Sequence, residues 1–242
     1  MVDVTAEQYI QRLEALTSLV ELEKIHRYFK TGEGEYAEDN IFMGVRMGSN
    51  FALAKEFVDM DLDEIEKMLD SPIHDVRVGA LSIMGKQFNK KKTTAARRKE
   101  LFDLYIRRTD RINSWDLVDL SGHHVVGGYL YDYDQPRDVL YDLARSKDWW
   151  ERRIAIFATL YFVRKGDLDD TFEIAEILVH DDHDLVQKAV GGLLREAGKT
   201  DQKRLLDFLD HYAKTMPRVE LRYAIEHLTP QRRQHYLGLK DS

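Results

Sequence analysis

The chain has 242 residues, a net charge of −7 and no cysteine. The lack of cysteine excludes disulfides, thiolate metal sites and cysteine nucleophiles. No stretch approaches the roughly 18 apolar residues of a membrane span, and the acidic N-terminus MVDVTAEQYIQRLEAL lacks the basic region of a signal peptide, so we expect a cytoplasmic protein without a membrane anchor.

The distribution of charge is uneven along the chain. Nucleic-acid-binding proteins are usually basic, so the overall charge argues against DNA as a partner. The segment from Lys86 to Arg111, however, holds ten Lys or Arg residues and only three acids. The sequence therefore allows a local basic face on an acidic protein.

Apolar residues recur at helical spacing through most of the chain, and β-hairpin signals are sparse. Each of the four prolines stands where a helix would begin. The segment TGEGEYAEDN, residues 31–40, is rich in glycine and acids and is predicted to be an exposed loop. In chain order the pattern predicts helices at 5–30, 50–58, 61–70, 72–88, 94–108, 115–130, 136–145, 148–164, 168–179, 183–197, 201–213, 217–227 and 230–237.

Several of these segments resemble one another. A small residue followed by an aliphatic one recurs at Ala80-Leu81, Ala155-Ile156, Ala189-Val190 and Ala224-Ile225. The last two intervals are each about one repeat of a helical-pair array, and the first is about two. We therefore predict an all-α, HEAT-like or armadillo-like solenoid of antiparallel helix pairs with a concave binding face, forming a single domain over 1–242.

The stretch INSWDLVDL places Trp115 and Asp119 four residues apart, on one helix face. Asn113 is predicted to cap this helix, with Asp116 at the third position reaching back to it. Asp116 then has a structural role, and Asp119 is left without one. One interpretation makes Trp115 a core residue and Asp119 a solvated or cap-pairing acid. The other is an aromatic platform beside a carboxylate, which suits a cationic ligand or transition state.

The stretch KDWWERRIAIF places Trp150 and Arg153 on a shared helix face, with Arg153 at the edge of an apolar run. Either Arg152 or Arg153 pairs with a neighbouring acid in a structural role, or Arg153 clamps a phosphate, for which a planar guanidinium is suited.

The histidines do not indicate a metal site. His123 and His124 are adjacent and would point in different directions on a helix, and the acidic company of His180 and His183 is more typical of a helix N-terminus. The loop TGEGEY has the wrong glycine spacing and too many acids to cradle phosphate. We expect neither a metal nor another cofactor.

Four blocks together resemble the AlkD-like family of DNA alkylation repair proteins. They are RYFKTGEGEY…FMGVR, NSWDLVD, WWERRIAIFATLYFVRKG and QKAVGGLLREAGKTD, in this order over nearly the whole chain. The resemblance implies a HEAT-like DNA glycosylase that removes N3- and N7-alkylated purines from double-stranded DNA. It also implies site roles for Tyr28, Trp115, Asp119 and Arg153. The family's tryptophan in the fourth block is replaced by Gly192.

This resemblance predicts a monomer in which Asp119 stabilises an oxocarbenium-like sugar, Trp115 stacks on it or on the cationic base, and Tyr28 shapes the site. Arg153 would hold a backbone phosphate near the lesion. The Gly192 departure motivates a second hypothesis, a non-catalytic DNA-binding relative, and the acidic charge a third, a protein-interaction scaffold. Further phosphate contacts are predicted at Lys86, Lys90, Arg152, Lys188, Arg195 and Lys199.

Overall fold

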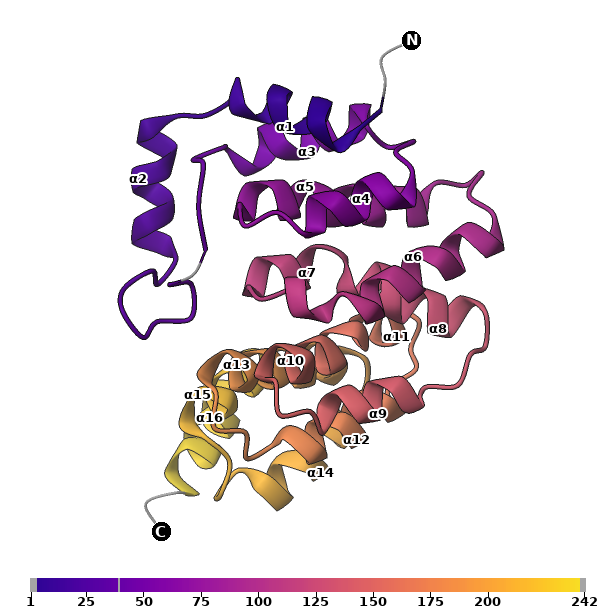
Figure 1. The fold of residues 1–242 in the computed structure, drawn as a ribbon. Helices are drawn as coiled ribbons and strands as arrows, with labels where there is room; N and C mark the ends of the chain where they lie inside the picture. Colours follow the sequence, from indigo (N-terminus) through magenta and orange to yellow (C-terminus); the bar gives the residue numbers. More distant parts are fainter. Residues whose placement is uncertain (1–3, 39, 240–242) are drawn as a thin grey trace. The chain divides into compact units, whose positions relative to one another are not determined.

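The structure is a computed structural model that describes residues 4–38 and 40–239. Throughout these residues the regular structure is helical, and the only β-type pairing is two isolated bridges, Thr17–Val45 and Ile41–Ile73. The prediction of an all-α protein is confirmed. The chain divides into two compact units, one ending at Val125 and one beginning at Val126, which are described separately (Figure 1).

The N-terminal unit is built around one long buried helix. Its elements are α1 (Ala6–Glu14), α2 (Leu19–Tyr28), α3 (Met47–Glu56), α4 (Leu62–Leu69), α5 (His74–Asn89), α6 (Ala95–Arg107), the 3-10 turn η1 (Thr109–Arg111) and α7 (Trp115–Gly122). Helix α5 packs against α3, α4, α6 and α7, and fourteen of its sixteen residues are buried. Gly79 lets α1 approach α5, because a Cβ there would lie 2.5 Å from the Tyr9 hydroxyl.

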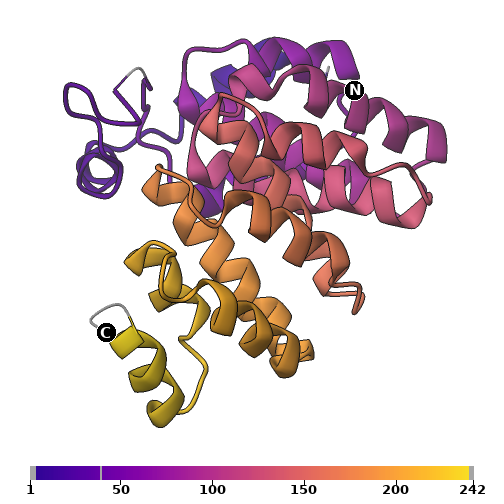
Figure 2. The ribbon, with the colours of Figure 1, turned by 90° about the horizontal axis from the view of Figure 1, so that it is seen from below.

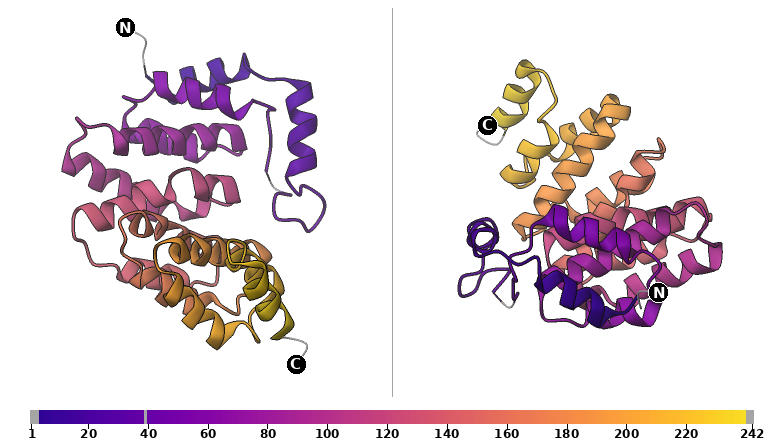
Figure 3. Two further views of the ribbon diagram at one scale, coloured as in Figure 1. Left: turned by 180° about the vertical axis from the view of Figure 1, so that it is seen from behind. Right: turned by 90° about the horizontal axis from the view of Figure 1, so that it is seen from above.

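Helix α2 differs from its neighbours because it contains no buried residue. In Figures 1 and 3 it runs across the direction of α1, α3 and α5, and the chain returns beside it towards α3. Leu22 and Ile25 of this helix pack against the buried residues Phe29, Ala37 and Phe42. Trp115, a residue of the site described below, packs against the same cluster.

The C-terminal unit has α13 as its central helix. Helix α13 packs against α10, α12, α14 and α15, and in Figure 2 the orange-to-yellow helices of this unit follow the order of the chain. A Cβ at Gly191 would lie 2.3 Å from the Glu220 carbonyl, so glycine is required where α13 meets α15. The elements are α8 (Gly128–Asp132), α9 (Asp138–Ala144), α10 (Trp149–Ala158), α11 (Leu160–Val163), α12 (Asp169–Leu178), α13 (Asp184–Thr200), α14 (Gln202–Tyr212), α15 (Arg218–Ala224) and α16 (Pro230–Gly238).

Three segments that are predicted to be continuous helices are interrupted in the structure. The helix expected at 5–30 is two helices, because Ser18 caps α2 by accepting from the Glu21 amide and Thr17 pairs with Val45. The helix expected at 115–130 passes through a π-helical turn, η2 (His123–Gly127), and the one at 148–164 is interrupted at Thr159. The other predicted helices are present, with ends displaced by a few residues.

Within each unit the central helix contacts one helix before it and one helix after it that are not its nearest neighbours in sequence. Helices α3, α5 and α7 are adjacent in the first unit, and α10, α13 and α15 in the second. That the two units form a single HEAT-like solenoid domain stays a prediction. None of the helices in the described part of the chain combines the length and apolar character that a bilayer crossing requires.

Candidate active site

The predicted aromatic platform is Trp115, the first residue of α7. Its side chain is half-buried. The Phe29 ring stacks on the indole at 5.4 Å between ring centroids and 19° between planes. Tyr28 contacts the same indole at 5.6 Å and 57°, and its own side chain is 71% exposed. The structure therefore brings Tyr28 and Trp115 together from helices far apart in sequence, with Tyr28 open to solvent.

Asp119 lies one turn after Trp115 on α7 and is half-buried. The spacing of four residues puts both side chains on one helix face. Tyr105, fully buried on α6, lies within electrostatic reach of this carboxylate. Burial first and the charge of Asp119 second raise the pKa of Tyr105, so the phenol stays protonated beside the acid. Tyr28, Trp115 and Asp119 all belong to the N-terminal unit.

Asp116 is the buried acid of this helix. It accepts hydrogen bonds from the His74 imidazole Nε2 at 3.0 Å and from the Ser114 hydroxyl at 2.6 Å. Burial acts to raise its pKa, but the charge and hydrogen bond of His74, with the Ser114 hydroxyl, hold the pKa of Asp116 below its ordinary value. The capping role expected for Asp116 is therefore wrong, and its carboxylate instead joins α7 to His74 of α5.

The predicted cap of α7 is wrong. Ser114, not Asn113, is the residue before the first helical turn. The Asn113 side-chain oxygen instead accepts a hydrogen bond from Arg77 Nη1 at 2.7 Å. The buried Arg77 also donates to Asn40. Asn113 therefore fixes the approach to α7 through a buried arginine on α5.

Replacing Asp116 with alanine is expected to lower the free energy of unfolding at neutral pH by about 3 kcal/mol, because it leaves His74 buried without its partner. The stabilisation from Asp116 exists above its unfolded pKa near 3.8 and is lost as the pH falls through its lower folded pKa. Urea unfolding at pH 7, with the exposed, ion-paired Asp103→Ala as the control, measures the effect. A loss below about 1 kcal/mol would contradict the pairing.

Arg153 lies in α10 of the C-terminal unit and is buried. Its Nη1 donates to the Leu185 carbonyl at 2.5 Å, and its guanidinium lies over the Phe157 ring at 5.8 Å. Arg152 makes a two-point ion pair with Asp181, at 2.5 and 3.2 Å, and donates to the Ser146 carbonyl. The structural alternative, a pair between one of these arginines and an acid, is confirmed for Arg152.

The other predicted phosphate contacts of this unit are lysines and an arginine on α13. Lys188 pairs with Asp184 at 2.7 Å, and Lys199 with Glu196 at 2.7 Å. Arg195 pairs with Glu226. Such partly exposed pairs contribute little stability, so a phosphate can replace the carboxylate at small cost.

Lys86 and Lys90 line an open pocket of about 590 Å³ in the N-terminal unit, and none of its lining residues is acidic. The Lys86 ammonium lies over the Phe51 ring at 5.6 Å, and Lys90 pairs with the exposed Asp59. Lys55 of α3 lines the same pocket, a residue that the sequence did not single out. Three lysines around one hollow favour an anionic ligand.

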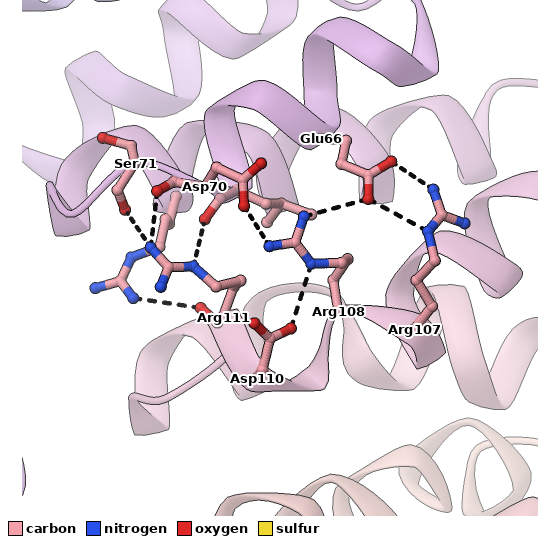
Figure 4. Close-up of polar contacts among 9 residues, drawn as sticks. Glu66, Asp70, Ser71, Arg107, Arg108, Asp110 and Arg111 are labelled. Atoms are coloured by element: carbon pink, nitrogen blue, oxygen red, sulfur yellow. Dashed lines mark hydrogen bonds and ion pairs between the residues drawn. The ribbon is translucent and has the colours of Figure 1, made fainter.

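Most arginines of the basic segment are occupied by contacts within the fold. Arg107 and Arg108 pair with Glu66 of α4 at 2.5 and 3.2 Å, and Arg108 also pairs with Asp70 and Asp110 (Figure 4). Arg111 donates to backbone carbonyls at the end of α4, including that of Ser71. This part of the expected basic face instead joins α4 to the end of α6.

His180 and His183 each contact another side chain of the fold. His180 is within 3.0 Å of the Thr215 hydroxyl, and His183 stacks on Trp149 at 3.5 Å and 13°. In the described ranges no three potential metal-binding side chains gather in one place. Gly192 lies on α13 with no atom within 4 Å of a Cβ built there, so the position where the family's tryptophan was expected is open.

Two comparisons with known proteins bear on the fold and on the family of this chain. A solved structure described as a predicted DNA alkylation repair enzyme from Enterococcus faecalis shares the fold, with a TM-score of 0.67 and 15% sequence identity over 88% of this chain and 97% of that chain. A family profile described as DNA alkylation repair enzyme matches residues 9–228. The chain belongs to this family, as the four sequence blocks predicted, which supports an enzymatic role in DNA repair. Among curated proteins, none matches the sequence.

Proposed function

We propose that this protein is a DNA glycosylase that hydrolyses the N-glycosidic bond of N3- and N7-alkylated purines in duplex DNA. The observation that supports this most is the pairing of a half-buried indole, Trp115, with a carboxylate, Asp119, one helical turn away. Family membership supports the DNA repair role. The substrate and the reaction type are what the resemblance to the AlkD-like family implies, and the chemistry of the pair is compatible with both.

The chemistry needs an anion more than an acid. An N3- or N7-alkylpurine is cationic, so its glycosidic bond is weakened and the base leaves as a neutral molecule. The sugar becomes oxocarbenium-like, and the carboxylate of Asp119 lowers the barrier by stabilising that charge and orienting the attacking water. The face of Trp115 stacks on the sugar or on the cationic base. Tyr28, beside the indole and exposed, closes the site over the lesion.

DNA would be held by the lysines and arginines described above. Lys86 and Lys90 are the best supported of these, because no acidic residue lines their pocket and the Asp59 partner of Lys90 is exposed. Arg153 and Arg152, with Lys188, Arg195 and Lys199 on α13, are further proposed phosphate contacts. We propose that both units contribute helix pairs to one HEAT-like domain over 1–242, which acts as a cytoplasmic monomer.

A second candidate function is supported by Gly192. Because no side chain stands at this position and the space above it is open, an aromatic wall of the site would be absent. The protein would then bind duplex DNA without releasing a base. Release or retention of the base distinguishes the two candidates.

The experiment uses two duplexes that differ in one atom of the lesion. One carries a single 7-methylguanine and the other 7-methyl-7-deazaguanine, which has the same shape but no positive charge. Excision of the first base alone, measured as free base at low salt, supports a glycosylase for cationic purines. Equal binding of both duplexes with no free base supports the non-catalytic candidate.

Replacing Lys86 with alanine is expected to weaken duplex binding at all sequences and to reduce the salt dependence of log K by about 1, because one phosphate contact is lost. Fluorescence anisotropy over a range of salt concentrations measures the slope. Lys67→Ala on α4, an exposed lysine outside the pocket that pairs with Glu64, is the control and should leave the slope unchanged. If Lys86→Ala and the parent protein have the same slope, Lys86 does not contact a phosphate.

A further inference from the structure

The indole of Trp115 is fixed by the segment that follows α2, which we call the arm (residues 29–38 and 40–42). Phe29 stacks on the indole at 5.4 Å with 19° between the planes. The indole Nε1 donates a hydrogen bond to the Tyr36 hydroxyl at 3.2 Å, across 79 residues of sequence. Both contacts come from the arm and both reach one side chain on α7.

The two contacts restrict different motions. A near-parallel stack fixes the plane of the indole, and the hydrogen bond fixes its rotation within that plane. The indole N–H is also the only polar group of tryptophan and is a donor only. Since Tyr36 accepts from it, Trp115 presents its ring surface and not a hydrogen bond to a ligand.

The arm also contacts α5. Phe42 contacts the His74 ring at 4.7 Å and Phe29 contacts it at 5.3 Å, and His74 bonds to Asp116, the residue next to Trp115. These contacts therefore link the arm to α5 and, through His74, to the start of α7. A shift of the arm would move the indole.

The acids of the arm fold the loop. Glu35 accepts a hydrogen bond from the Gly32 amide at 2.8 Å, and Glu38 accepts one from the Gly34 amide at 2.7 Å. Gly34 has a φ of +75°, which favours glycine. The acid-rich composition that argues against phosphate binding in this loop thus serves the turn that presents Tyr36.

We propose that Tyr36 and Phe29 are positioning residues for base excision, acting through the orientation of Trp115. This inference rests on the proposed glycosylase function. A tyrosine that only stabilised the fold would change the unfolding free energy and leave the chemical step untouched. A positioning residue changes the rate of the chemical step in the bound complex. Misalignment of the aromatic ring removes more stabilisation from the transition state than from the bound ground state.

The test is Tyr36→Phe, which removes one oxygen atom and keeps the ring. Tyr161→Phe is the matched control, because its hydroxyl also bonds to another side chain, Asp132, at 2.8 Å. Single-turnover release of 7-methylguanine is expected to fall roughly tenfold in Tyr36→Phe with duplex affinity unchanged. Phe29→Leu is expected to show the same separation of rate from affinity. An unchanged rate in Tyr36→Phe, with an active parent, overturns the proposal.

A second measurement does not depend on activity. The protein has three tryptophans, so its amide spectrum contains three indole N–H signals, and Trp115→Phe identifies the one from Trp115. Tyr36→Phe is expected to shift that signal and speed its exchange with solvent, and Tyr161→Phe is not. If the parent releases no base, the glycosylase function fails while a shifted signal still supports positioning of Trp115. An unshifted signal overturns the positioning itself.

Discussion

Replacing Asp119 with asparagine is expected to lower the rate of 7-methylguanine release by at least about 100-fold, because the variant keeps the shape of the side chain and loses the charge that stabilises the oxocarbenium-like sugar. The side chain is half-buried, and the buried carboxylate of α7 is Asp116. The fold should therefore survive the change. Single-turnover release from methylated duplex, beside thermal unfolding, separates the two effects.

The control for this variant is Asp103→Asn on α6, an exposed acid paired with Lys99. It changes the net charge by the same amount, so a general electrostatic effect on DNA binding would appear in both variants. If Asp119→Asn excises the base as fast as the parent, Asp119 is not the catalytic carboxylate. If both variants slow equally, the effect is one of overall charge.

Replacing Glu220 with glutamine is expected to stabilise the protein by roughly 3 kcal/mol at pH 7. The side chain of Glu220 is fully buried in α15, and neither carboxyl oxygen has a hydrogen-bond partner among the described residues. Burial first, and the charge of Asp181 second, raise the pKa of Glu220 from 4.5 to about 9. The folded protein therefore carries a neutral carboxylic acid at physiological pH.

The stability gained by Glu220→Gln depends on pH in a definite direction. Because the folded pKa of Glu220 lies above the unfolded value, the folded state retains a proton that the unfolded state releases, and stability falls as the pH rises from about 4.5 to about 9. The glutamine variant lacks this loss, so its advantage should be near zero at pH 4.5 and grow with pH. Denaturant unfolding at pH 5 and pH 8 measures it, with Glu226→Gln, an exposed residue, as control. An equal gain in the free energy of unfolding at pH 5 and at pH 8 would contradict the raised pKa of Glu220.

The positions of most helices follow from the sequence because each buries one apolar face, and that face recurs every three to four residues. The break between α1 and α2 was missed because the apolar spacing of Leu13, Leu16 and Leu19 continues through it. The signal for the break was present as Ser18 followed by Glu21, the pattern of a capping box. Ser18 caps α2 in the structure.

Within the site, the local pair was predictable and the distant partners were not. Trp115 and Asp119 share a face because of helix geometry alone. The Tyr36 contact joins residues 79 positions apart, and no periodicity encodes it. The charge of the basic segment can likewise be counted in the sequence, but the partners of its arginines cannot be read from it. The ion pairs of its arginines with Glu66 and Asp70 depend on how α4 packs against α6 and cannot be counted in advance.

The most direct test of the glycosylase proposal is the fate of methylated duplex DNA incubated with the purified protein at low salt. We expect free 3-methyladenine and 7-methylguanine to appear above the spontaneous rate, together with strands that stay intact until alkali cleaves them at abasic sites. Both products together mean hydrolysis of the glycosidic bond. Bound duplex without free base would contradict the proposal and direct attention to the open position at Gly192.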